Sequence, residues 1–180
     1  MSAPKLNVTR LPARLAADAR RVIARPFLPG GAGRIGAVIG RVLALTDAEV
    51  SSMLSTVLAD YRTRHKDIRG IFRQNYAMAI AQPVVAAQAS PSDERRLLLG
   101  AYFTSEYSLE SVALFNPSMV LHPDQNGVPP GSARFIVSLR ACGEGHISSI
   151  EFRTGIVDSS REIILDPRTR FAITARAMAD

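Results

Sequence analysis

Cysteine and long apolar runs are both scarce in this sequence. One cysteine, Cys142, is present among 180 residues, which excludes an internal disulfide and leaves too few thiolates for a cysteine-based zinc site. No apolar stretch of about 18 or more residues occurs, and the N-terminus has no apolar run followed by a small-residue cleavage site. We therefore expect a cytoplasmic protein without a membrane span.

Acidic residues are few in the first part of the chain. Residues 1–75 contain 13 Lys and Arg against 5 Asp and Glu, whereas residues 76–180 contain 9 against 11. A basic half can bind nucleic acid or an acidic partner, but these arginines are spread singly and do not cluster with aromatic residues. We expect a solvated face or a contact between copies in a homo-oligomer, and not nucleic-acid binding.

Three familiar motifs are formally present, but each lacks its usual context. Residues 31–36, GAGRIG, match GxGxxG, yet prolines precede them and residues 37–45 read as a β-branched apolar segment, so a flexible glycine turn is expected. His122, Asp124 and His146 have no spacing that fixes them on one face, so no metal site is expected. The serines near His146 lack the strained turn of a nucleophile elbow.

The first half is predicted to be an extended arm followed by helices. Residues 1–33 are rich in Arg, Ala, Pro and Gly and read as arm and loop. Thr46 and Glu49 form a capping box before apolar residues at helical spacing, which predicts a helix over roughly residues 47–64. A second apolar series starting at Ile68 predicts another helix ending near Pro83, and residues 83–93 read as a connector.

The second half is predicted to be richer in strands. Residues 94–114 keep a helical spacing that Asn116-Pro117 is expected to stop, and four strand-like runs then predict an antiparallel meander: 118–121, 134–140, 149–153 and 162–165. The expected fold class is α+β. We expect a basic arm and helical region over residues 1–92, and a helix plus one unit resembling a propeller blade over residues 93–180.

The turn between the second and third of these runs concentrates polar side chains. Residues 138–149, SLRACGEGHISS, include Arg140, Glu144, His146 and Ser148. Arg offers a planar fork of donors, Glu accepts from hydroxyls, and Ser and His can do either, which suits a polyhydroxylated ligand. A hairpin that satisfies only its own backbone is the alternative. Strand alternation predicts that Arg140 lies on the face opposite Leu139.

Two long runs resemble the larger bacterial members of glycoside hydrolase family 130, the β-mannoside phosphorylases and mannosidases. They are AYFTSEYSLESVALFNPSMVLHPDQ (101–125) and RFIVSLRACGEGHISSIEFRTG (134–155). Residues 21–30 and 41–50 also look like the N-terminal helical region of that group. The resemblance implies a five-bladed β-propeller preceded by helices, with a central cavity that binds the sugar.

The resemblance also implies a site. Asn116 and Arg140 would face the cavity and contact the glycone, while Glu144, His146 and Ser148 would line its rim. The implied ligand is a β-mannoside or a related oligosaccharide, and the implied reaction inverts the anomeric carbon. No cofactor is implied, and inorganic phosphate would be the co-substrate of a phosphorylase.

The sequence departs from the family in its catalytic residues. The proton donor and the phosphate-binding residues of the family belong to later blades, whereas this sequence covers about one blade. We therefore assign a catalytic role to no residue here, and we expect either a truncated protein or a propeller that a second polypeptide completes. The competing hypothesis is a non-catalytic binding or assembly module that uses the basic helical half.

Overall fold

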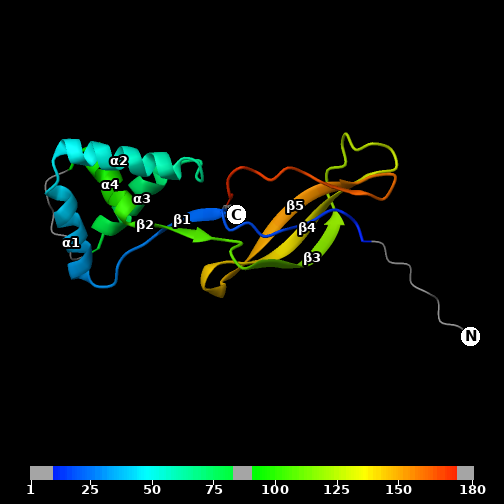
Figure 1. Cartoon of the computed structure of the whole chain (residues 1–180), viewed down its shortest axis with the longest axis horizontal. Helices are drawn as coiled ribbons and strands as arrows, with labels where there is room; N and C mark the ends of the chain where they lie inside the picture. Colours follow the sequence, from blue (N-terminus) through cyan, green and yellow to red (C-terminus); the bar gives the residue numbers. More distant parts are fainter. Residues whose placement is uncertain (1–9, 83–90, 174–180) are drawn as a thin grey trace, which may run out of the picture. The chain divides into compact units, whose positions relative to one another are not determined.

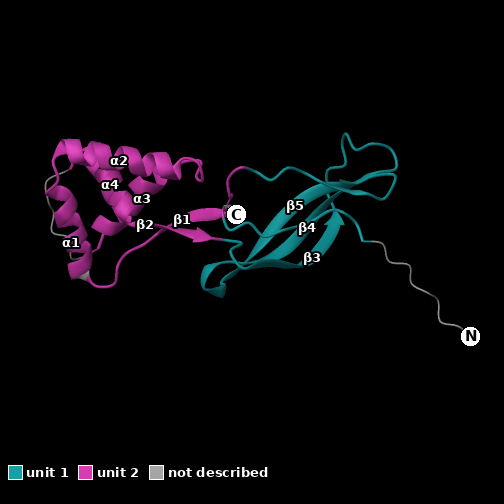
Figure 2. Ribbon diagram, viewed as in Figure 1, with its two compact units in different colours: residues 1–19, 109–169 teal, residues 20–108, 170–180 magenta. Residues whose placement is uncertain are grey.

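The chain forms two compact units, and the computed structural model describes residues 10–82 and 91–173 of it. The helical unit consists of residues 20–108 with 170–180 and contains all four helices of the described chain. The sheet unit consists of residues 1–19 with 109–169 and contains an antiparallel sheet (Figures 1 and 2). The predicted α+β class is thereby confirmed.

The helical unit is built around a helix late in its sequence. Its helices are α1 (Ala32–Leu43), α2 (Asp47–Tyr61), α3 (Ile68–Ile80) and α4 (Asp93–Tyr102). Leu97, Leu98 and Leu99 of α4 are at most 1% exposed and face two clusters formed with the other helices. Burying each such side chain contributes about 1.5–3 kcal/mol. The boundary expected from the sequence, after residue 92, would separate α4 from these partners. In the structure, the boundary between the two units follows Ser108.

A glycine permits the close approach of α3 and α4. A Cβ atom at Gly100 would lie 1.9 Å from the carbonyl oxygen of Phe72, well inside van der Waals contact. Phe72 is fully buried at this crossing. Only glycine therefore fits at position 100. Because glycine has no Cβ atom, the backbones of α3 and α4 can approach this closely.

The helices predicted from apolar spacing are confirmed. The capping box of α2 is present, with the Thr46 amide donating to Glu49 Oε2 at 2.7 Å and the Glu49 amide donating to Thr46 Oγ1 at 3.3 Å. The second predicted helix corresponds to α3, which Asp67 caps by accepting from the Gly70 amide at 2.9 Å. These caps satisfy backbone donors that have no partner within the helix.

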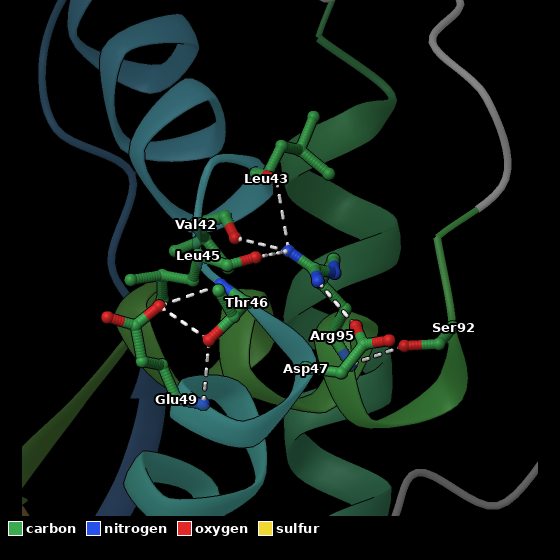
Figure 3. A network of polar contacts seen from close by, with 8 residues as sticks. All are labelled: Val42, Leu43, Leu45, Thr46, Asp47, Glu49, Ser92 and Arg95. Carbon is green, nitrogen blue, oxygen red and sulfur yellow. Dashed lines mark hydrogen bonds and ion pairs between the residues drawn. The ribbon is translucent and has the colours of Figure 1, made fainter.

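One arginine ties three helices together (Figure 3). Nη1 of Arg95, on α4, donates to three carbonyl oxygens at the end of α1, those of Val42, Leu43 and Leu45, at 2.9, 3.1 and 2.8 Å. Nη2 donates to Asp47 at 2.6 Å, in the first turn of α2. A cation at these carbonyls is favourable because the C-terminal end of a helix carries partial negative charge.

Three predictions for the helical unit are wrong. Residues 37–45 are mainly helical, since Ile35, Ile39 and Val42 recur at helical spacing and bury one face of α1. The expected arm contains β1 (Val22–Pro26), which pairs antiparallel with β2 (Thr104–Ser108), where a continuing helix was expected. Pro26 is tolerated at the end of a strand because no ladder hydrogen bond is needed from it there.

The sheet unit confirms the predicted meander. Its strands are β3 (Ala113–Leu121), β4 (Ala133–Cys142), β5 (Ser148–Val157) and β6 (Ile163–Leu165), ordered β3-β4-β5-β6 with every neighbouring pair antiparallel. The helix turn η1 (Glu144–His146) joins β4 to β5. The expected helix stop at Asn116-Pro117 is wrong. Both residues lie within β3, where the register shifts between Phe115 and Ser118.

One face of this sheet is well covered. Phe135, Val137 and Leu139 are at most 2% exposed, and Leu15 from the preceding arm packs against them. On the same face the carboxylate of Glu110 accepts from Arg153 Nη2 at 2.5 Å and from the Asp18 amide at 3.0 Å. These bonds fasten the arm to the inner face of the sheet.

The opposite face is apolar and exposed. Antiparallel pairing places Ile150 opposite Arg140, Phe152 opposite Ser138 and Ile164 opposite Ile156, so all these side chains share one face. Ile150, Phe152 and Ile164 are 61%, 63% and 57% exposed. A sheet with apolar side chains on both faces is typical of a layer that packs between two others.

Candidate functional site

Arg140 lies on the exposed apolar face of the sheet, where two neighbouring side chains hold it. Arg140 lies near the end of β4, opposite Phe115 of β3 and Ile150 of β5. Its guanidinium carbon is 5.1 Å from the centroid of the Phe115 ring, and its Nε donates to Ser148 Oγ at 3.0 Å. Three strands thus fix the position of this cation.

No carboxylate among the described residues neutralises the charge of Arg140. Within the described residues, Arg140 makes no ion pair, and its two Nη groups donate to no protein acceptor. Glu151 lies on the opposite face, where Arg153 donates to it at 3.0 Å. An exposed guanidinium held through Nε keeps two parallel donors for a ligand.

Asn116 is adjacent to this arrangement but is not bonded to it. It follows Phe115 at the register shift of β3, is exposed, and has a φ of 53°. Asparagine tolerates this left-handed conformation better than most residues, and such backbone irregularities are enriched at functional sites. The register shift therefore places the exposed Asn116 amide next in sequence to Phe115, whose ring contacts Arg140.

Glu144 and His146 occupy the η1 turn and are exposed. Gly145 and His146 have φ values of 61° and 60°, and the Gly143 amide closes the turn by donating to the Ile147 carbonyl at 3.0 Å. No contact joins either side chain to Arg140 in the described chain. Of the five predicted residues, Arg140 and Ser148 are brought into contact, while Asn116 lies in the neighbouring strand β3 and Glu144 and His146 lie in the η1 turn.

Sequence reasoning missed the aromatic part of this face. Phe115 supports the guanidinium, and Phe152 lies two residues from Ile150 on the same side of β5. The signal was available in the alternation of Ile150 and Phe152 with Glu151 and Arg153. Because the apolar pair and the charged pair occupy opposite faces, one face had to be apolar at the surface or covered by another layer.

The sheet also contains a buried ionic cluster that sequence reasoning missed. Glu110 is 0% exposed and accepts from Arg153 at 2.5 Å and from Arg168 at 3.4 Å, while Arg168 also donates to the Ala16 carbonyl. The opposite charges of this cluster pair with one another inside the fold, which offsets the cost of burying them. This cluster anchors the arm and the segment after β6, so we assign it a structural role.

No metal centre is gathered in the described ranges, where no three His, Cys, Asp or Glu side chains converge. The His122 side chain makes a local turn contact, since the Asp124 amide donates to its Nδ1 at 3.0 Å. Within these ranges, no single helix is long and apolar enough to span a membrane; only the bent pair of Gly33–Leu43 and Asp47–Tyr61 reaches that length and composition together.

Comparison with known proteins identifies no relative: no protein-family model, curated protein or solved structure matches this chain. The candidate site therefore rests on its own geometry.

Proposed function

We propose that the sheet unit carries part of a carbohydrate-binding site centred on Arg140, in a protein resembling the inverting β-mannoside phosphorylases and hydrolases. The observation that carries the proposal is the exposed Arg140 guanidinium, which Ser148 and Phe115 orient and which has no carboxylate partner among the described residues. Such a fork can donate two directed hydrogen bonds to neighbouring hydroxyls of a sugar.

The surroundings of Arg140 suit the two kinds of surface that a sugar presents. Hydroxyls of the ligand would meet the guanidinium, the Asn116 amide and the polar side chains of η1. The C–H face of a sugar ring would meet exposed apolar groups such as Phe152, which is 63% exposed. A site with a few directed polar groups among apolar ones is typical of small-molecule recognition.

The proposed role of this chain is substrate binding without a catalytic acid of its own. Inversion needs an acid and an opposed nucleophile, which is water in a hydrolase and phosphate in a phosphorylase. We assign neither role to a residue of the described chain. By resemblance, the meander would be one blade of a β-propeller, and its exposed apolar face is the kind of surface that a neighbouring blade covers.

A cytoplasmic location belongs to the same proposal. Its support is the single cysteine, which is buried and unpaired in the described structure. Disulfides are common in secreted domains and rare in the cytosol.

Titration of the chain with a β-1,4-linked mannobiose, followed by amide chemical shifts, tests the proposed site. We expect weak binding, with a Kd of about 1 mM or weaker since the ligand contacts one wall only, and shifts around Phe115, Arg140 and Ser148. Arg140→Ala should abolish the shifts. Arg134→Ala is the matched control, because Arg134 lies on the same face of the same strand but about 20 Å away. Shifts that persist in Arg140→Ala would remove this residue from the site.

A further inference from the structure

The helical unit contains an open groove that the sugar proposal does not use. Its volume is about 670 Å³, within the range of pockets for small molecules. One wall is a stripe along α2, and the other is the loop between α2 and α3 with the first turn of α3. Residues from α4 and the segment after the sheet complete it; the lining includes Ser55, Leu58, Arg62, Lys66, Arg69 and Phe171.

Three exposed basic side chains line this groove. Arg62 follows the last residue of α2, Lys66 lies in the loop, and Arg69 is in the first turn of α3. None of them makes a side-chain hydrogen bond or an ion pair within the described residues. Exposed cations of this kind are available to an anion.

Two carboxylates also line the groove and reduce its net charge. Asp67 is already engaged, because it accepts from the Gly70 amide at 2.9 Å as the cap of α3. Glu94 lies in the first turn of α4, where a negative charge is favourable next to the helix N-terminus. The three cations therefore exceed the carboxylates, and each carboxylate has a local structural role.

A buried histidine contributes a further polar group to the wall. His65 Nε2 lies 2.6 Å from Glu106 Oε1, and Arg64 donates two hydrogen bonds to the same carboxylate at 2.8 and 3.1 Å. His65 is one of the residues that line the groove.

The rest of the groove is apolar with hydroxyl groups at its edge. Leu54, Leu58 and Ile68 form an apolar floor between α2 and α3, and Phe171 adds an aromatic side chain. Ser51 and Ser55 of α2 line the same groove and offer hydroxyls. A ligand that matches this lining has an anionic end and a compact body with an apolar face.

We propose that this groove binds a small organic phosphate, with the phosphate among Arg62, Lys66 and Arg69 and the organic body over Leu54 and Leu58. A phosphate monoester carries a charge of about −1.5 to −2 at pH 7 and three acceptor oxygens, which matches three donors better than a carboxylate does. The proposal does not depend on the sugar-binding site, because it concerns different residues in a different unit.

Phenyl phosphate is a suitable probe because it joins a phosphate dianion to a compact apolar ring. We expect calorimetric titration of the full chain to show saturable binding, and inorganic phosphate to bind at least about fivefold more weakly because it leaves the apolar floor exposed. Arg69→Gln and Lys66→Gln should each weaken phenyl phosphate at least about fivefold. Lys66 is exposed and lies outside the helices, so we expect its substitution to change stability by less than about 0.5 kcal/mol.

Arg34→Gln is the matched control, since it removes the same charge from an exposed position on α1 that does not line the groove. We expect it to change the affinity less than about twofold. An equal loss in Arg34→Gln and Arg69→Gln would show that only net charge attracts the probe, and it would overturn the proposal. Absence of saturable phenyl phosphate binding, or equal affinity for inorganic phosphate, would also overturn it.

Discussion

Two arginines on neighbouring strands of the sheet unit have opposite environments. Arg153 is 8% exposed and is paired with Glu110 and Glu151 on the covered face. Arg140 is exposed on the other face and is held by a hydroxyl and an aromatic ring. Removal of one partner from a buried ion pair leaves an unpaired charge and costs several kcal/mol, whereas an exposed arginine contributes little to stability.

Arg140 is therefore expected to affect activity more than stability. In a protein completed by further blades, Arg140→Ala and Arg140→Lys should each lower kcat/KM at least about tenfold, or roughly 1.4 kcal/mol of transition-state binding. Lysine fails because it presents a point charge and not a planar fork. Steady-state kinetics and melting curves measure the two effects separately. Unchanged kinetics in Arg140→Ala, with Arg134→Ala as reference, would contradict the assignment.

Glu106 is expected to make the helical unit sensitive to acid. Burial acts to raise its pKa, but hydrogen bonds from Arg64 and His65, together with their charges, outweigh this and leave the pKa below its ordinary value. A carboxyl group whose folded pKa is lowered stabilises the fold fully above the unfolded pKa of about 4.3. That contribution is lost as the pH falls through the lower folded pKa.

Urea unfolding at several pH values tests this expectation. Glu106→Gln should be less stable than the natural sequence at pH 7, and the difference should shrink between about pH 5 and pH 3. Asp60→Asn, an exposed carboxylate of α2 without an ion pair in the described chain, serves as the control. A stability difference that stays constant down to about pH 3 would show that Glu106 does not titrate as proposed.

At the scale of elements, the sequence predicted those parts of the fold whose signals are local. The capping box of Thr46 and the apolar spacing of α2 predicted that helix, and the alternation around Val137 predicted the faces of β4. These patterns depend on neighbouring residues, so they can be interpreted without the tertiary structure.

Elements defined by distant contacts were missed. β1 forms because residues 22–26 pair with residues 104–108, more than 70 positions away, and nothing near Val22 indicates its partner. α1 was missed because its glycines and β-branched residues lower helix propensity, while the packing of Ile35 and Ile39 on α4 stabilises it. The candidate site follows the same rule: Ser148 was predicted, but its bond to Arg140 depends on strand register.

The junction of α1, α2 and α4 depends on one side chain, so it gives a sharp test at this scale. Arg95→Ala should destabilise the helical unit by about 2–3 kcal/mol, since charge-assisted bonds to three carbonyls and a carboxylate are lost from a mostly buried position. Arg95→Lys should recover only part of this loss, because an ammonium group cannot reproduce the fork. Urea unfolding monitored by circular dichroism measures both values. Arg73→Ala, which breaks an exposed pair with Asp93, is the control expected to cost less than about 1 kcal/mol.

At the scale of the whole molecule, the proposed binding groups have no assigned pair of catalytic groups beside them in the described chain. We expect the purified chain to turn over β-mannosides at no measurable rate, with or without phosphate, because inversion requires both an acid and an opposed nucleophile. The assay is release of the reducing sugar or sugar phosphate from mannobiose at several pH values. Robust turnover by homogeneous material would place a catalytic acid within these 180 residues.

The exposed face of the sheet should also make the purified chain self-associate. Ile150 and Phe152 are 61% and 63% exposed on a face that also includes Ile164, and β3 and β6 are the edge strands of this sheet in the described chain. Sedimentation velocity should show a weight-average mass that rises with concentration.

Phe152→Lys should shift the distribution toward monomer, because a charge on this face opposes its burial. Phe27→Lys is the matched control, since Phe27 is a similarly exposed aromatic residue, 52% exposed, in the helical unit. A monodisperse monomer at about 100 μM would exclude self-association with a Kd in the micromolar range. The apolar face would then not mediate assembly.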